Sequence, residues 1–303
     1  MDNMQKIPVF FTFDANYLLA AKVAIHSMMK HASRQYWYEL YVFHTTLSPK
    51  AQQSLRNSLK EFTHTELHFI DVTQYNEKIK NFGTKAHYSK EIFYKLIATD
   101  VLPQYDRIIC SDVDVVFTGD FSPVFFMFPN EKFYYAGVGP VENSRMPYYR
   151  KDFSTTEMEI LEHEIAAGFL LINLKELRND HKQEEIINFY VNNYPRLRLP
   201  EQDCIILTCW PYIKYLPIDY SLPISFYRLN MNQRDFYQGN TEFAGDKATA
   251  LAKFNKGLAH PVQIHYAGFD KPWNCFRLTR RQDWIKAMKS TPGGMVLDRK
   301  SVV

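Results

Sequence analysis

The sequence predicts an α/β fold in which helices flank a mainly parallel, mixed sheet, followed by an irregular C-terminal extension. Three observations support this prediction. Apolar, strand-like runs alternate with segments of helical periodicity from residue 8 to residue 117, the order typical of parallel strands joined by crossover helices. The 303 residues are 46% hydrophobic and 23% charged, which suffices for a large buried core. No low-complexity linker or internal repeat divides the chain, so we expect one domain over residues 1–275 and a tail over 276–303.

The first half of the sequence contains four predicted strands separated by three predicted helices. Ser48 and Pro49 are typical of a helix start, because serine accepts hydrogen bonds from the first turn and proline fits its first position. Pro103 ends the third helix. In order, we expect strand 8–13, helix 18–31, strand 37–44, a helix from 48 to about 62, strand 66–72, helix 92–101 and a strand that starts at 107 and ends at the acids 112 and 114.

The second half is less regular. We expect apolar strands over 133–138 and 168–174, with a polar, aromatic loop or flap over 143–152 between them. Helices are predicted over 184–193 and from 199 to about 209. Residues 219–258, rich in Tyr, Asn and Gln, are expected to be irregular, and a final strand over 261–264 ends at His265.

Composition excludes several classes of protein. A net charge of +3 is too mild to indicate a nucleic-acid partner. The four cysteines form no C-x-x-C pair and are expected to be reduced, mostly buried thiols of a cytoplasmic protein. We expect neither a signal peptide nor a membrane span, because no basic-then-apolar leader or long uncharged apolar window occurs.

Two pairs of polar residues follow predicted parallel strands. Asp14 and Asn16 come after the first strand, and Asp112 and Asp114 come after the fourth. Ligands of such sheets bind beyond the carboxyl ends of the strands, so the two pairs should lie at the same edge. Two carboxylates there could grip a hard divalent cation. An Asp-x-Asp pair alone, however, also fits an ordinary cap at a strand end.

A second motif covers residues 265–273 and contains His265, Gly268, Lys271 and a Pro-Trp pair. A histidine at a strand end can complete an oxygen-rich metal site. Gly268 allows the backbone to approach a phosphate closely, and Lys271 offers it a point charge. Each of these residues alone also fits an ordinary surface or turn position, so the combination carries the prediction.

Five motifs in order resemble those of a known family. They are residues 13–17, 107–119, 168–174, 201–203 and 265–273. From residue 9 to residue 273 the chain resembles the retaining nucleotide-sugar glycosyltransferases that include glycogenin and the bacterial lipopolysaccharide α-galactosyl- and α-glucosyltransferases. The resemblance implies a GT-A type fold, a UDP-hexose donor and Mn²⁺, or Mg²⁺ in its place.

The resemblance also implies roles for individual residues. The implied metal ligands are Asp112, Asp114 and His265. The implied donor-binding residues are Thr12, Asp14, Asn16, Tyr17, Asp112, Val113, Asp114, Gly268 and Lys271. The implied catalytic residues are Gln202, which lies near the anomeric carbon, together with Lys95 and Glu201.

The physical chemistry of such a reaction agrees with these roles. The departing UDP gains negative charge, which a metal and Lys271 can stabilise, and the carbonyl oxygen of Gln202 can steady an oxocarbenium-like sugar. Gln202 is a poor nucleophile, and no alternative carboxylate stands out. We therefore favour front-face attack over a covalent intermediate.

Three positions depart from the family pattern and bear on the sugar. Lys95 stands where arginine is usual, Gly139 follows a strand that commonly leads to an aspartate, and Ala166 stands where asparagine is common. The nearest acid to Gly139 is Glu142. Galactose and glucose are the leading donor sugars, and an N-acetylated or other hexose stays open.

The acceptor, expected to be an oligosaccharide, a lipid-linked glycan or a glycoprotein, is harder to read. Segments 143–152 and 225–240 are either acceptor walls or plain irregular surface. The basic, partly apolar segment 277–289 is either a solvated helix or a peripheral contact with the inner face of the cytoplasmic membrane. Two alternatives to a lipopolysaccharide or surface-glycan transferase stay open: a catalytically impaired nucleotide-sugar binding protein and a metal-dependent phosphohydrolase.

Overall fold

Seven strands form the central sheet, in the order β3-β2-β1-β4-β7-β6-β8. The computed structural model describes residues 4–80, 82, 89–141, 149, 151–229, 242–243 and 245–294. The strands of the central sheet are β1 (Lys6–Thr12), β2 (Trp37–His44), β3 (Thr65–Asp71), β4 (Ile108–Ser111), β6 (Tyr135–Val138), β7 (Phe169–Ile172) and β8 (Ile213–Leu216). A second, three-stranded sheet has the order β5-β10-β9 and consists of β5 (Val115–Phe117), β10 (Gln263–His265) and β9 (Leu222–Pro223).

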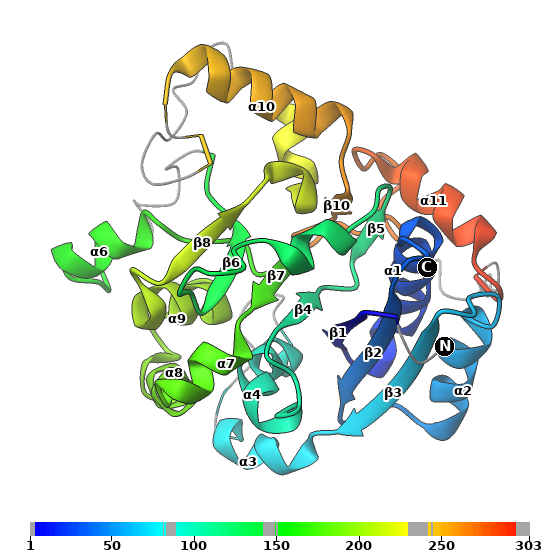
Figure 1. Ribbon diagram of the computed structural model, residues 1–303, viewed down its shortest axis with the longest axis horizontal. Helices are drawn as coiled ribbons and strands as arrows, with labels where there is room; N and C mark the ends of the chain where they lie inside the picture. The colour runs from blue at the N-terminus through cyan, green and yellow to red at the C-terminus, as the bar shows by residue number, and fades with distance from the viewer. Residues whose placement is uncertain are drawn as a thin grey trace.

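Helices surround these sheets (Figure 1). The α-helices are α1 (Leu18–His31), α2 (Pro49–Ser58), α3 (Asn76–Ile79), α4 (Ala98–Val101), α6 (Thr155–Leu161), α7 (Leu174–Asn179), α8 (Lys182–Asn193), α9 (Pro200–Cys209), α10 (Lys247–Ala259) and α11 (Arg281–Ser290). The 3₁₀ helices are η1 (Ala15–Tyr17), η2 (Thr73–Tyr75), η3 (Lys90–Ile97), η4 (Ser122–Phe126), η5 (Ile218–Tyr220) and η6 (Ile224–Arg228).

The predicted alternation of strands and helices in the first half is confirmed. β3, β2, β1 and β4 are parallel, and β7 is antiparallel to both of its neighbours, so the sheet is mixed. Ile7, Val9 and Phe11 pack with α1, α2 and α10 on one face of the sheet. Phe10 belongs to the cluster on the other face, which contains η3, α7, α8 and α9. Both faces of β1 are therefore buried, as in other parallel sheets covered by helices.

One expectation about local structure is wrong. The sequence predicts irregular structure over residues 219–258, but most of the 13-residue helix α10 lies there, together with β9, η6 and part of η5. Asp246 caps α10 by accepting a hydrogen bond from the backbone N–H of Thr249 at 2.9 Å. Ala250, Phe254 and Gly257 form its buried side. The bias toward Tyr, Asn and Gln lies mainly before this helix, in residues 230–241, which are outside the described part of the chain.

Two smaller differences concern element boundaries. The predicted helix over 92–101 is a 3₁₀ helix, η3, followed by the single turn α4. The predicted strand over 168–174 ends at Ile172, because the side chain of Asn173 caps α7. The sheet edge where β1 and β4 end is unaffected by either difference.

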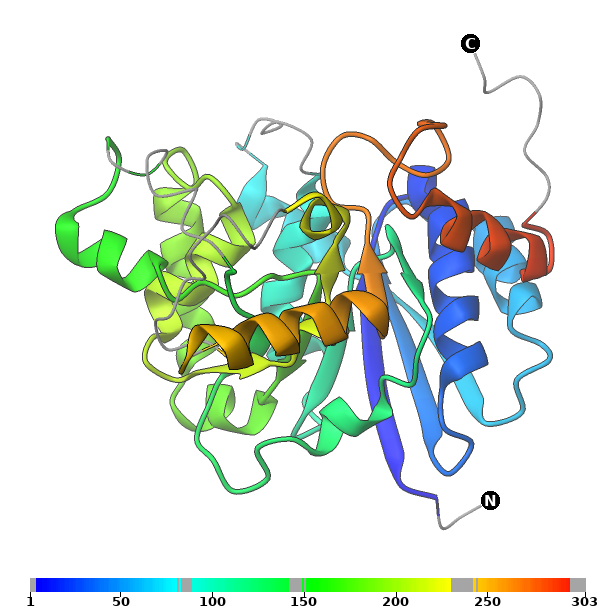
Figure 2. The same cartoon turned by 90° about the horizontal axis from the view of Figure 1, so that it is seen from above.

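The C-terminal helix α11 lies beside α1, as both Figure 1 and the rotated view in Figure 2 show. Trp284 and Met288 on this helix are buried in a small cluster with Val23 of α1 and Val116 of β5. The apolar side of α11 is therefore occupied by the protein itself. None of the helices in the described ranges combines the length and apolar character that a membrane crossing requires.

Candidate active site

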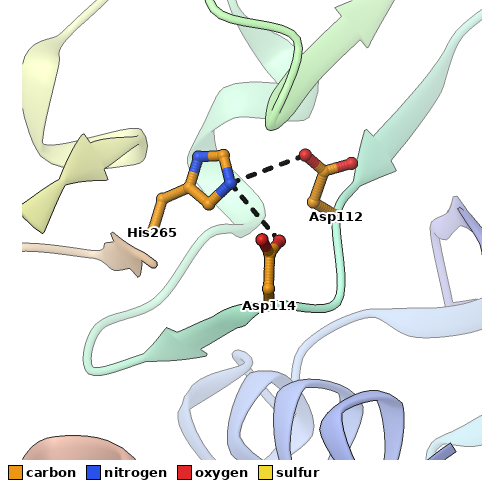
Figure 3. Close-up of side chains that lie close together, drawn as sticks. All are labelled: Asp112, Asp114 and His265. Atoms are coloured by element: carbon orange, nitrogen blue, oxygen red, sulfur yellow. Dashed lines mark ion pairs between the residues drawn. The ribbon is translucent and has the colours of Figure 1, made fainter. Parts of the chain in front are cut away.

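Three possible metal ligands converge beyond the carboxyl end of β4. Asp112 and Asp114 lie in the turn between β4 and β5, and His265 is the last residue of β10, which pairs antiparallel with β5. Nε2 of His265 lies 3.6 Å from Oδ2 of Asp112 and 3.3 Å from Oδ1 of Asp114 (Figure 3). One ligand atom from each residue lies within 4.8 Å of the other two. The strand order thus joins ligands from distant parts of the chain.

The start of β7 leaves room for this histidine. A Cβ atom on Gly168 would lie 2.5 Å from Nδ1 of His265, so any larger residue would collide with the imidazole in this position. The carbonyl oxygen of Gly168 also accepts a hydrogen bond from the backbone N–H of Asp112 at 3.0 Å. The glycine that begins the 168–174 motif therefore shapes the metal-ligand cluster through its backbone.

Each carboxylate of the cluster is divided between a lysine and the histidine. The ammonium of Lys95 lies 2.6 Å from Oδ1 of Asp112, and that of Lys271 lies 2.6 Å from Oδ2 of Asp114. The second oxygen of each acid faces His265. Two carboxylate oxygens and an imidazole nitrogen suit a divalent cation such as Mn²⁺. The residues present therefore fit the metal that the resemblance implies.

Burial and neighbouring charges shift the pKa values of three groups in and beside the cluster. Burial opposes ionisation of Asp114, but the adjacent His265 and Lys271 outweigh it and lower the pKa of the carboxyl group. Burial also disfavours a charged Lys95, yet Asp112 and Glu201 hold the pKa of its ammonium above the ordinary value. Burial raises the pKa of Glu201, although Lys95 acts in the opposite direction. Each acid thus has a cation beside it: Lys95 lies beside Asp112 and Glu201, and Lys271 lies beside Asp114.

A cavity of about 430 Å³ opens over the cluster. Its lining includes the predicted site residues Thr12, Asp14, Tyr17, Lys95, Asp112, Val113, Asp114, Glu201, Gln202, His265, Gly268 and Lys271. Asn16 is not among the lining residues, and its side-chain amide donates to Oδ2 of Asp14 at 3.2 Å. The structure therefore brings the predicted residues to one cavity, with Asn16 at its margin.

The end of β1 forms one wall of the cavity. Asp14 caps η1 by accepting a hydrogen bond from the backbone N–H of Asn16 at 2.9 Å. The rings of Tyr17 and Trp273 form a T-shaped pair, with 5.8 Å between ring centroids and 87° between planes. Burial, with Asp114 nearby, raises the pKa of Tyr17 to about 12, so its hydroxyl stays neutral. The motifs 13–17 and 265–273 are thus in contact through these two rings.

The start of α9 forms the opposite wall. Oε1 of Gln202 accepts a hydrogen bond from the backbone N–H of Ala167 at 3.3 Å, and Oε1 of Glu201 lies 3.3 Å from the ammonium of Lys95. Asp203 is buried and does not line the cavity. It accepts hydrogen bonds from the hydroxyl of Tyr149 and from the backbone N–H groups of Arg198 and Leu199. Asp203 therefore shapes the turn into α9, while Glu201 and Gln202 face the site.

The three positions that depart from the family pattern all line this cavity: Lys95, Gly139 and Ala166. The cavity also contains acids that the sequence did not single out, Glu91 of η3 and Glu164 before β7. Glu91 lies four residues before Lys95 but outside the predicted helix 92–101, whereas the structure begins η3 at Lys90. Glu164 lies between elements, where periodicity gives no direction for a side chain.

Parts of the predicted acceptor region lie outside the described residues. Glu142 and most of the 143–152 flap belong to this part, as do residues 230–240 of the second candidate wall. Of the remainder, Ser225 and Phe226 line the cavity.

The four cysteines are free thiols, and three of them are buried, as the sequence predicted.

Three known glycosyltransferases are similar to this chain over most of its length. The lipopolysaccharide 1,2-glucosyltransferase of Escherichia coli is 22% identical over 283 residues, covering 90% of this chain and 75% of that protein. The structure of the bifunctional glycosyltransferase WbbM matches 97% of this chain with a TM-score of 0.74 and 22% identity. This chain spans about half, 51%, of the WbbM chain. The galactosyltransferase LgtC, in complex with donor and acceptor sugar analogs, matches with a TM-score of 0.71 and 16% identity, covering 94% of this chain and 96% of that one.

The structural matches confirm the predicted GT-A fold. The sequence model for Glycosyl transferase family 8 matches residues 8–276, most of the chain. The predicted enzyme class is likewise confirmed. The chain is a glycosyltransferase and belongs to glycosyl transferase family 8.

Proposed function

We propose that this enzyme transfers a hexose, galactose or glucose, from a UDP-sugar to a glycan acceptor with retention of the anomeric configuration. The observation that carries the proposal is the cluster of Asp112, Asp114 and His265 beside Lys271 in a single cavity. The names of two similar proteins, a lipopolysaccharide glucosyltransferase and a galactosyltransferase, support a bacterial surface glycan as the product.

The metal cluster would hold Mn²⁺, or Mg²⁺ in its place, through Asp112, Asp114 and His265. When bound, the ion supplies positive charge that stabilises the departing diphosphate. Lys271 adds a second positive charge at the same wall of the cavity. Gly268 has a φ of 101°, a conformation that favours glycine, and no atom lies within 4 Å of the Cβ position. That open backbone suits close approach of a phosphate.

The uridine would lie at the end of β1, against Thr12, Asp14, Asn16, Tyr17 and Val113. Asp14 offers carboxylate oxygens as acceptors, and Tyr17 offers an aromatic ring that is packed against Trp273. Stacking of a base on such a ring is tolerant of sequence and geometry.

The sugar would lie between the metal cluster and α9. Gln202 would steady positive charge on the anomeric carbon through its amide oxygen, and Glu201 would accept a hydrogen bond from a sugar hydroxyl. We favour front-face attack, in which the acceptor hydroxyl approaches from the side of the departing phosphate. Gln202 is too weak a nucleophile for a covalent intermediate.

The acceptor, an oligosaccharide, lipid-linked glycan or glycoprotein, would enter past Ser225 and Phe226. We place the enzyme in the cytoplasm, at the inner face of the membrane. Because Trp284 is buried against α1, contact with anionic lipid would use exposed residues, namely Lys286 and Lys289 of α11 and Phe276, whose side chain is 72% exposed. The apolar side of the helix is not available for this.

Hydrolysis of the donor tests the proposed reaction without a known acceptor. The full chain is incubated with Mn²⁺ and UDP-glucose or UDP-galactose, and released UDP is measured. We expect slow release of UDP that requires Mn²⁺. Tight binding of both sugars without any release of UDP would instead support a binding protein that has lost turnover.

A further inference from the structure

Lys95 is enclosed by acceptors from three parts of the chain. Its side chain is 2% exposed. Its ammonium lies 2.6 Å from Oδ1 of Asp112, 3.0 Å from the carbonyl oxygen of Ala167 and 3.3 Å from Oε1 of Glu201. An ammonium group has three N–H donors, so these three contacts account for all of them. Lys95 has no donor left for a hydroxyl or phosphate of a ligand.

The two acids on Lys95 face in different directions. Oδ2 of Asp112 faces His265 within the metal cluster. Oε2 of Glu201 is buried, lacks a hydrogen-bond partner among the described residues, and belongs to a residue that lines the cavity. One ammonium therefore contacts one oxygen of each acid and leaves the second oxygen of each without contact to Lys95.

We propose that Lys95 is a positioning residue that couples the metal cluster to Glu201 and touches neither donor nor acceptor. The inference rests on the proposed metal site and deepens it. Two carboxylates share one cation, so a change of charge at Glu201 alters how strongly Lys95 competes with a metal ion for Asp112. By linkage, a ligand that contacts Glu201 and a metal ion at Asp112 affect each other's affinity.

The test measures Mn²⁺ affinity of the full chain without nucleotide, by isothermal titration calorimetry. Glu201→Gln is nearly isosteric and keeps Lys95 in place, but leaves Asp112 as its only carboxylate partner. We expect the Kd for Mn²⁺ to rise about tenfold, although Glu201 is not a metal ligand.

Glu91→Gln is the matched control. Glu91 is 3% exposed and lines the same cavity, yet it makes no hydrogen bond or ion pair with Lys95 in the described structure. Its replacement removes an equal charge without touching the shared ammonium. We expect the Kd for Mn²⁺ to change by less than about twofold, since that charge is coupled only through space.

The following outcomes decide the inference. An unchanged Kd in Glu201→Gln, or an equal rise in Glu201→Gln and Glu91→Gln, overturns the coupling and leaves the proposed metal site intact. Absence of Mn²⁺ binding by the unaltered chain contradicts the metal site itself and the coupling with it. In a Lys95→Met background the effect of Glu201→Gln should fall below about threefold. If that background does not fold, the comparison of Glu201→Gln with Glu91→Gln still decides.

Discussion

Lys271 and Lys95 each lie 2.6 Å from one acid of the metal cluster, yet they belong to different sides of the cavity. Lys271 lies in the loop after β10, and its ammonium has two acceptors, Oδ2 of Asp114 and the carbonyl oxygen of Tyr266 at 2.9 Å. Lys95 is on η3, and its ammonium has three acceptors, Oδ1 of Asp112, the carbonyl oxygen of Ala167 and Oε1 of Glu201. The two lysines thus differ although their charges and distances are equal. Lys271 keeps one N–H donor for a ligand, whereas the protein itself engages all three donors of Lys95.

The two sides also differ in how they are built. The Lys271 side consists of loops that end β1 and β10, and the neighbouring Tyr17 and Gly268 line the cavity. The Lys95 side consists of the last turn of η3, the first turn of α9 and the residues before β7, and η3 and α9 both contribute to the core. The first side is therefore the one that we propose binds nucleotide and phosphate, and the second side holds Asp112 and Glu201 through Lys95.

The largest effect should come from replacing Asp114, which contacts both His265 and Lys271. We expect Asp114→Asn to lower the rate of UDP release about 100-fold or more at saturating Mn²⁺. The substitution removes the negative charge of a residue that is both a proposed metal ligand and the partner of Lys271. Asp106→Asn, before the opposite end of β4, should retain activity. Full activity of Asp114→Asn would show that the metal is not held here.

Replacing Lys271 tests whether the loop side meets the phosphates. We expect Lys271→Met to weaken binding of UDP with Mn²⁺ about thirtyfold, because a charged hydrogen bond is lost. Lys132→Met is the control, since Lys132 pairs with Asp180 away from the cavity. Equal UDP affinities for Lys271→Met and the control, measured by calorimetry, would remove the difference between the two lysines.

The base is expected to rest on the same loop side. Tyr17→Ala should weaken UDP binding about tenfold, since an aromatic stacking surface is lost. Tyr17→Phe keeps the ring and should stay within about twofold. If Tyr17→Phe were as weak as Tyr17→Ala in the same titration, the hydroxyl rather than the ring would make the contact.

The smallest effect concerns α11, which continues the chain from the loop side. Lys289 is exposed on this helix. We expect Lys289→Gln to lower binding to vesicles that contain anionic lipid about fivefold, with no effect on UDP affinity. Co-sedimentation with vesicles measures this, and neutral vesicles serve as the reference. Equal binding of the chain to both kinds of vesicle would contradict an electrostatic contact.

Much of the metal cluster could be predicted from the sequence because the ends of apolar strands can be recognised there. The rule that parallel strands end at one edge predicted that Asp112 and Asp114 lie beside Asp14 and Asn16. His265 ends a strand of the second sheet, and it was added to the cluster by the family resemblance. Gly168 fits the same logic, although its contact with His265 depends on a neighbouring strand. Helix α10 was missed because the bias of the preceding residues outweighed its regular spacing.

The role of Lys95 was beyond sequence reasoning for a physical reason. Its two acids lie on different elements, and Glu201 is 106 residues away in the chain. Local periodicity predicts which face of a helix is buried but not which distant carboxylate meets a buried ammonium. The same holds for Glu91 and Glu164, whose places in the cavity depend on how η3 and β7 pack.

The most direct test of the central claim, a metal-dependent site for a UDP-sugar, is a thermal-shift panel. The chain is melted with and without Mn²⁺ in the presence of UDP, UDP-glucose, UDP-galactose, UDP-N-acetylglucosamine or a GDP-sugar. A ligand that binds the native state raises the Tm as its concentration exceeds the Kd. We predict a rise with UDP and with a UDP-hexose that requires Mn²⁺. An equal rise without Mn²⁺, or a larger rise with the GDP-sugar, would contradict the account.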